Sequence, residues 1–163
     1  MAQGMTFERT YDWELIKKIV THPKVWPHIS DDFTPKPEGW STPQSPAIIY
    51  MLIKDSSDII GLMIFHPENA VCLETHICML PIAYGERTRE AVRGALQWIW
   101  DNTNCRRVVG RIPVYNTLAI ACAIATGFSK FGLNPKSYMK DGILHDIVEL
   151  GISKTEATCP GAQ

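Results

Sequence analysis

Residues 90–128 read EAVRGALQWIWDNTNCRRVVGRIPVYNTLAIACAIATGF, and they contain two helix-like segments on either side of a short apolar strand. The first helix is expected over 87–102, because its apolar residues recur with the spacing of a single helix face. The second helix opens on Asn116, a favoured N-cap, and closes on Gly127, which suits the position just after a helix. Its interior is almost purely small and apolar, so something other than a side chain could lie against it.

The rest of the chain supplies strands and one more helix around this stretch. Apolar runs separated by turn residues predict three antiparallel strands before it and a hairpin after it. The expected strands cover 5–10, 47–55, 59–65, 71–80, 106–114, 128–132 and 143–153, and a first helix, capped by Asp12, covers 12–23. This order predicts an α+β fold in which helices pack on one mixed, mostly antiparallel sheet.

The composition is that of an ordinary globular protein. The 163 residues are 45% hydrophobic and 20% charged with a net charge of −1, which argues against a nucleic-acid groove, and no apolar run suggests a membrane span. Five cysteines form no CxxC pair and no ligand spacing, so we expect no metal site and a reducing, cytoplasmic setting. We expect one domain over 1–154, followed by a flexible polar tail over 155–163.

Over about residues 5–154 the chain resembles the GNAT superfamily of acyl-CoA-dependent N-acetyltransferases. The likeness is carried by 90–128, where a Glu-Ala helix start, an Arg-Val-Val strand and an Asn precede Gly-Phe, and by the ending YMKDGILHDIVELGISK (138–154). HPKVWPHISDD (22–32) and HDIVELGISK (145–154) are further similar to GNAT-like proteins encoded by tailed bacteriophages. The resemblance implies a GNAT-like sheet with splayed fourth and fifth strands, and acetyl-CoA (coenzyme A) as the cofactor.

The resemblance also implies that the cofactor lies beside the second helix, which would explain the small residues there. Asn116 would cap this helix and reach toward the cofactor. Met79 and Leu80 would offer backbone groups to the pantetheine arm and to the oxyanion. The plainer alternative is that Asn116 is only an N-cap and that alanine is present because it favours helices.

The turn PIAYGERTREA (81–91) is the expected pyrophosphate site. A helix N-terminus offers free N–H groups and the positive end of a dipole to phosphates, and glycine permits close approach. Contacts are expected from Gly85, Arg87, Thr88 and Arg89, although Glu86 replaces a glycine of the family pattern and would repel a phosphate unless it turns away. Six of the seven arginines fall between 87 and 111, which favours phosphate recognition or, alternatively, a solvated helix face.

The strand VCLETHICML (71–80) carries the candidate catalytic residues. Alternation places Glu74 and His76 on one face, together with Cys72 and Cys78, and apolar residues on the other. An ammonium group is not a nucleophile, so N-acetylation needs a general base. Glu74 matches the family's strand-four glutamate and is the expected base. His76 is the second candidate, because histidine titrates near neutrality. The alternative is a polar outer face on a half-exposed sheet.

One position departs from the family in a way that affects the chemistry. Ala123 stands where many members carry the tyrosine that protonates the departing thiolate. Tyr84 or Tyr138 could replace it in space. We therefore expect slow turnover, or none.

Two functions remain open at this point. The first is N-acetyltransfer from acetyl-CoA by direct attack of an amine, on a small molecule or on a protein or peptide. Its acceptor would be selected by the loop DDFTPKPEGWSTP (31–43). The second is a catalytically degenerate protein that acts in bacteriophage assembly or in the virion, binding phage structural proteins or copies of itself. An exposed Trp98 or Trp100 would mark such an interface.

Overall fold

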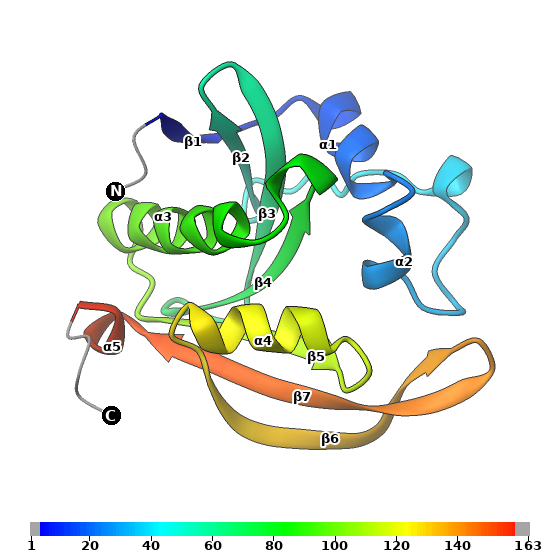
Figure 1. The fold of residues 1–163 in the computed structure, drawn as a ribbon. Coiled ribbons are helices and arrows are strands. Elements are labelled where there is room, and N and C mark those ends of the chain that lie inside the picture. Colours follow the sequence, from blue (N-terminus) through cyan, green and yellow to red (C-terminus); the bar gives the residue numbers. More distant parts are fainter. Residues whose placement is uncertain (1–3, 159–163) are drawn as a thin grey trace.

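The computed structural model describes residues 4–158 and contains one seven-stranded sheet with helices on both of its faces (Figure 1). The strands are β1 (Met5–Arg9), β2 (Ile49–Asp55), β3 (Asp58–Pro67), β4 (Cys72–Met79), β5 (Arg107–Pro113), β6 (Ser129–Lys140) and β7 (Ile143–Ser153). The helices are α1 (Trp13–Val20), α2 (Trp26–Ile29), α3 (Glu86–Asn102), α4 (Thr117–Ala125) and α5 (Lys154–Thr158), with 3-10 turns η1 (Pro37–Gly39) and η2 (Pro81–Ala83). The predicted α+β class is confirmed.

The strands lie in the order β1-β2-β3-β4-β5-β7-β6, and only the β4–β5 pair is parallel. Alternate residues of β2 serve the two faces of the sheet. Met51 and Ile53 pack in one core with α3, whereas Tyr50 and Leu52 pack in a second core with α1. Full burial of a large apolar side chain contributes about 1.5–3 kcal/mol to the free energy of unfolding. The packing of α3 on one face and α1 on the other therefore stabilises the sheet from both sides.

The parallel strands β4 and β5 part soon after they pair. Their register covers only Cys72 with Arg107, Leu73 with Val108 and Glu74 with Val109. Beyond these residues β4 remains paired with β3 as far as Met79, while β5 remains paired with β7. The predicted splay of the fourth and fifth strands is therefore confirmed, and α4 follows β5 directly along the chain (Figure 1).

Several local predictions need correction. Asp12 does cap the first helix, because its Oδ1 accepts a hydrogen bond from the N–H of Leu15 at 3.0 Å. The helix nevertheless ends at Val20 rather than continuing to residue 23, and the short α2 follows it. The sequence contains a proline at position 23, and the residue before a proline disfavours helical geometry.

The last hairpin is longer than predicted. β6 runs on to Lys140, with register shifts between Lys130 and Gly132 and between Asn134 and Tyr138. It is the outer strand of the sheet, the place where a strand tolerates an internal proline such as the one at position 135. The predicted strand therefore stopped too early because its Asn-Pro step reads as a turn.

The surface differs from expectation at the tryptophans and at the C-terminal end. Trp100 is buried and Trp98 is partly buried against the core of α3, so neither is the exposed interface residue that was considered. Lys154 starts α5, and the rest of the predicted tail after residue 158, including Cys159, lies outside the described residues. No helix within residues 4–158 is both long and apolar enough to cross a membrane.

Candidate active site

A pocket of about 470 Å³ lies between β4, the start of α3 and α4. Five of the predicted cofactor residues line it: Met79, Gly85, Thr88, Arg89 and Asn116. A smaller recess of about 100 Å³ adjoins it where β4 and β5 part, and the two hollows share His28, Ile77, Asn116 and Ala119. The predicted residues His76 and Ala123 line this recess. The structure thus gathers most of the predicted site into two adjoining hollows.

The start of α3 is shaped by Gly85. Its φ of +93° lies in a region that L side chains rarely adopt, and a Cβ at this position would meet no atom within 4 Å. The Thr88 hydroxyl donates to the carbonyl oxygen of Ala83 at 2.7 Å and ties the preceding turn to the helix. The open space beside Gly85 and the N-terminal end of a 17-residue helix together suit a phosphate group.

The negative charge of Glu86, next to this space, is paired with two arginines. Its carboxylate accepts hydrogen bonds from Arg93 and Arg89, each at 3.1 Å. The bond from Arg93, followed by that from Arg89, lowers the pKa of Glu86. The expected repulsion of a phosphate is therefore reduced by two guanidinium groups.

The arginines that cluster in the sequence disperse in space. Arg87 pairs with Asp55 at 2.9 Å and does not line the pocket, and Arg93 also donates to the carbonyl oxygen of Ala125. Arg107 and Arg111 lie on β5 and do not line the larger pocket. Of the described arginines in this cluster, only Arg89 lines the larger pocket.

The two backbone positions at the end of β4 differ. The N–H of Leu80 donates to the carbonyl oxygen of Ile60 at 2.9 Å, so it is engaged by β3 and is not free for an oxyanion. Because successive N–H groups of a strand point to opposite sides, that of Met79 points away from β3 and toward the gap left by β5. The N–H of Met79 is therefore available for the predicted backbone contact, and the N–H of Leu80 is not.

The second predicted helix, α4, forms the outer wall of both hollows. Asn116 is its N-cap, and its Oδ1 accepts from the N–H of Ala119 at 3.3 Å. Ala119, Ala121 and Cys122 line the larger pocket, so the small residues do border open space. Burial raises the pKa of the Cys122 thiol, which makes this cysteine a poor nucleophile near neutral pH.

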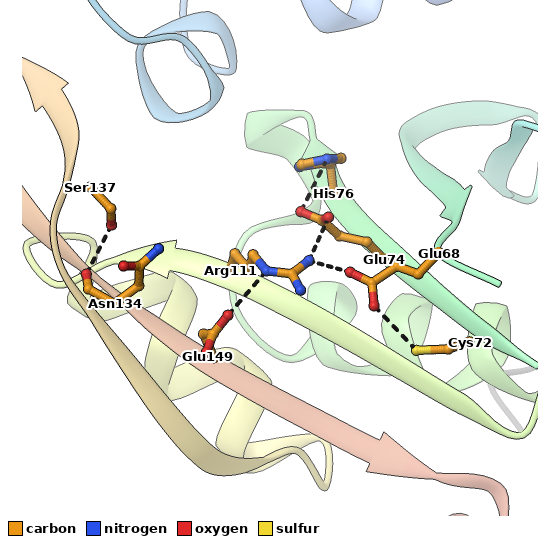
Figure 2. Close-up of polar contacts among 8 residues, drawn as sticks. All are labelled: Glu68, Cys72, Glu74, His76, Arg111, Asn134, Ser137 and Glu149. Atoms are coloured by element: carbon orange, nitrogen blue, oxygen red, sulfur yellow. Dashed lines mark hydrogen bonds and ion pairs between the residues drawn. The ribbon is translucent and has the colours of Figure 1, made fainter.

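Glu74 and His76 lie on one face of β4, as predicted, but they are not equivalent (Figure 2). One oxygen of Glu74 accepts a hydrogen bond from Arg111 at 2.7 Å, and the other lies 3.8 Å from Nε2 of His76. Arg111 also binds Glu68 and, at 3.2 Å, Glu149. Glu74 lines neither hollow, whereas His76 lines the recess.

The environment of His76 favours its neutral form. Burial lowers the pKa of His76, and His66 and Arg111 lower it further, while Glu74 acts in the opposite direction. The His66 ring packs edge-on at a centroid distance of 5.2 Å, and burial also lowers the pKa of His66. A neutral imidazole beside the recess can accept a proton from an amine.

Three residues of the site were not identified from the sequence. His28, on α2, lines both hollows, and Thr75 lines the recess. Arg111 was noted only as a member of the arginine cluster. The local sequence did not signal its role as partner of three carboxylates, because Arg106 and Arg107 precede it in the same predicted strand. Of the two tyrosines proposed to replace the missing one, Tyr84 lines the larger pocket and Tyr138 lines neither hollow.

No group of three or more His, Cys, Asp or Glu side chains that could hold a metal ion occurs among residues 4–158.

No protein-family model matches the chain, and no curated protein matches it by sequence. Solved structures do match. The spermidine N-acetyltransferase of Vibrio cholerae in complex with CoA and spermine has a TM-score of 0.80 and 15% identity, covering 96% of this chain and 99% of that one.

A chimera of that enzyme, SpeG, with hSSAT also gives a TM-score of 0.80 at 16% identity, covering 96% and 99% of the two chains. Mutant forms of the Vibrio cholerae spermidine/spermine N-acetyltransferase give a TM-score of 0.76 at 16% identity, covering 95% of this chain and 96% of that one. At these identities the likeness establishes the fold. The chain has the GNAT fold that the sequence resemblance implied.

Proposed function

We propose that the protein is an acetyl-CoA-dependent N-acetyltransferase that acts on a small-molecule amine by direct attack. The observation that carries this proposal is the continuity of the two hollows, which connect the start of α3 at Gly85 with His76 at the split between β4 and β5. The shared fold with N-acetyltransferases supports it, since one of those structures holds CoA and a polyamine.

The residues present fit a CoA thioester. The free N–H groups at the start of α3 and the guanidinium of Arg89 suit a pyrophosphate, and the N–H of Met79 together with the small residues of α4 suits a narrow amide-bearing arm. When bound, the thioester supplies an activated acyl group. Its transfer needs no cysteine, in agreement with the raised pKa of Cys122.

His76 is the proposed general base. As the amine nitrogen forms its bond to the acyl carbon, the carbon–sulfur bond breaks, and His76 accepts the proton that the nitrogen loses. The thiolate takes a proton from solvent, since Ala123 offers none. Glu74 and Arg111 act on His76 as positioning residues, because Glu74 lies 3.8 Å from its Nε2 atom and is itself held by Arg111.

The charges near His76 favour a cationic acceptor. Three carboxylates, those of Glu68, Glu74 and Glu149, surround the single guanidinium of Arg111, which leaves a surplus of negative charge on this side of the sheet. A small amine that carries a second ammonium group would be attracted there. A peptide amine is the competing acceptor, and an acceptor panel distinguishes the two.

The experiment combines binding and turnover. Calorimetry with acetyl-CoA and with CoA tests the pocket, and thiol release with mono-, di- and polyamines and with peptides tests transfer. His76→Gln should lower kcat/KM by about 10²–10⁴-fold while the Kd of CoA stays the same. His145→Gln is the matched control, because His145 lies on β7 and lines neither hollow. Absence of CoA binding at millimolar concentration would overturn the proposal.

A second candidate function is a non-catalytic role in protein assembly. The observation in its favour is the apolar surface of the β6–β7 hairpin, where four large side chains are more than half exposed: Phe131, Leu133, Ile143 and Leu144. The bacteriophage association, a cytoplasmic or virion location and self-association stay predictions. Sedimentation analysis tests this role, since a protein that forms oligomers yet binds no CoA would favour assembly.

A further inference from the structure

The recess at the strand split extends beyond what the catalytic histidine requires. Its inner wall is formed by the buried residues Ala123, Phe128 and Leu150, to which Ile112 and Ala119 add further apolar surface. His76 and Arg111 line the same recess from β4 and β5. The recess therefore has an apolar inner end beneath α4 and shares four lining residues with the larger pocket.

The size of the recess exceeds that of an acetyl group. An apolar cavity of roughly 150 Å³ can bind benzene, a molecule of six carbons. A recess of about 100 Å³ then accommodates on the order of four carbons by the same measure. Helix α4 contributes only methyl side chains to this space, those of Ala119 and Ala123.

An unpaired hydroxyl also lies at this recess. Thr75 is 7% exposed, and its Oγ1 has no hydrogen-bond partner among the described residues. A buried hydroxyl without a partner is unfavourable, so native proteins rarely keep one without a use. Thr75 lies on the same face of β4 as the core residues Leu73 and Met79, the face that α4 covers. A carbonyl oxygen in the recess would accept its hydrogen bond.

We propose that the recess receives the acyl group of the CoA thioester, that Thr75 donates to the acyl carbonyl oxygen, and that Ala123 leaves room for acyl chains longer than acetyl, up to about butyryl. This inference rests on the proposed function, because it presupposes a CoA thioester in the larger pocket. It goes beyond that function by naming the class of acyl donor. The small side chain of Ala123 thus determines donor length.

The test measures the Kd of CoA, acetyl-CoA, butyryl-CoA and octanoyl-CoA by calorimetry. Burial of a methylene strengthens binding up to about fourfold, so butyryl-CoA should bind at least as tightly as acetyl-CoA. Octanoyl-CoA should bind less tightly than butyryl-CoA, because its chain exceeds the recess. Ala123→Leu should raise the Kd of butyryl-CoA about tenfold or more and leave the Kd of CoA within about twofold of the wild-type value. Ala123→Val is the milder variant if the leucine disturbs folding.

Thr75→Val and Thr75→Ser distinguish the effect of the hydroxyl group from the effect of side-chain volume. Thr75→Val should keep the melting temperature, since it removes a hydroxyl that has no partner, and should weaken acyl-CoA about fivefold relative to CoA. Thr75→Ser should bind acyl-CoA like the wild type. If CoA and acetyl-CoA bind but butyryl-CoA binds tenfold more weakly than acetyl-CoA, this inference is overturned and the acetyltransferase proposal stands. If CoA itself does not bind, both fail.

Discussion

The Nε2 atom of His76 lies 3.8 Å from Oε1 of Glu74, while the other oxygen of Glu74 accepts a hydrogen bond from Arg111. This relationship favours His76 as the base, whereas the sequence suggested Glu74 as the base and His76 as the second candidate. Glu74 is engaged by a guanidinium and lies outside both hollows, whereas His76 lines the recess and has a lowered pKa through burial. In the proposed reaction, the carboxylate therefore acts through the imidazole.

The first prediction concerns the pH profile of kcat/KM. His76 acts as a base only when neutral, so activity should be complete above its folded-state pKa and should fall as the pH drops through that value, which lies below 6.5. Glu74 raises this pKa, so Glu74→Gln should move the acidic limb to lower pH. NMR titration of the His76 ring measures the same shift without turnover.

The opposite assignment gives a different result. If Glu74 itself accepts the proton, Glu74→Gln should lower kcat/KM by about 10²–10⁴-fold at every pH, and His76→Gln should have a small effect. An acidic limb that stays in place in Glu74→Gln would also contradict the positioning role.

A second prediction concerns Arg111. Replacing it with methionine leaves Glu68, Glu74 and Glu149 without their shared partner (Figure 2). We expect a loss of about 2 kcal/mol in the free energy of unfolding at pH 7, since hydrogen bonds to charged groups contribute about that much. Urea denaturation at pH 7 measures it, with the exposed Arg106→Met as the control.

The parts of the fold that depend on local chemistry could be predicted from the sequence. Asn116 caps α4 and Asp12 caps α1 through their own side chains, and the alternation along β4 assigned Glu74 and His76 to one face. Helix caps and strand faces need no knowledge of the distant chain. The splay of β4 and β5 was predicted only through the family resemblance.

The rest of the site depends on which distant segments become neighbours. Arg111 lies opposite Glu149 because β5 pairs with β7 in that register, and it reaches Glu74 because β4 and β5 part just there. The engagement of the Leu80 amide depends on the pairing of β4 with β3. Nothing in the local sequence distinguishes Arg89, which lines the pocket, from Arg87, which pairs with Asp55.

A third prediction concerns the turn between β6 and β7. The carboxylate of Asp32 accepts hydrogen bonds from the N–H groups of Asp141 and Gly142, each at 2.8 Å. These bonds lower the pKa of Asp32 below 3.8, so their stabilisation is complete above about that pH and is lost as the pH falls through the folded-state value. Asp32→Asn should increase hydrogen exchange at Asp141 and Gly142 at neutral pH. The exposed Asp58→Asn should not.

A fourth prediction isolates the backbone of Gly85. Alanine at this position would meet no neighbouring atom, so its cost is conformational and should be about 1–3 kcal/mol. Gly110→Ala is the matched control, because its Cβ would also meet open space while its φ is not positive. Urea denaturation compares the two variants. Equal stabilities would mean that the turn before α3 relaxes to a conformation that alanine accepts.

The last prediction separates two arginines that are close in sequence. Arg89 lines the larger pocket beside Gly85, whereas Arg87 is paired with Asp55 at 2.9 Å and does not line it. Arg89→Ala should therefore weaken CoA binding about five- to tenfold at low salt, and Arg87→Ala should change it less than twofold. Contacts between exposed charges are screened over about 10 Å at 0.1 M salt, so the difference between wild type and Arg89→Ala should narrow as salt is added. Titrations of CoA and of dephospho-CoA at several salt concentrations measure this. Equal losses in both variants would mean that Arg87 leaves Asp55 to reach the ligand, and no loss in either would make the arginines of α3 a solvated surface.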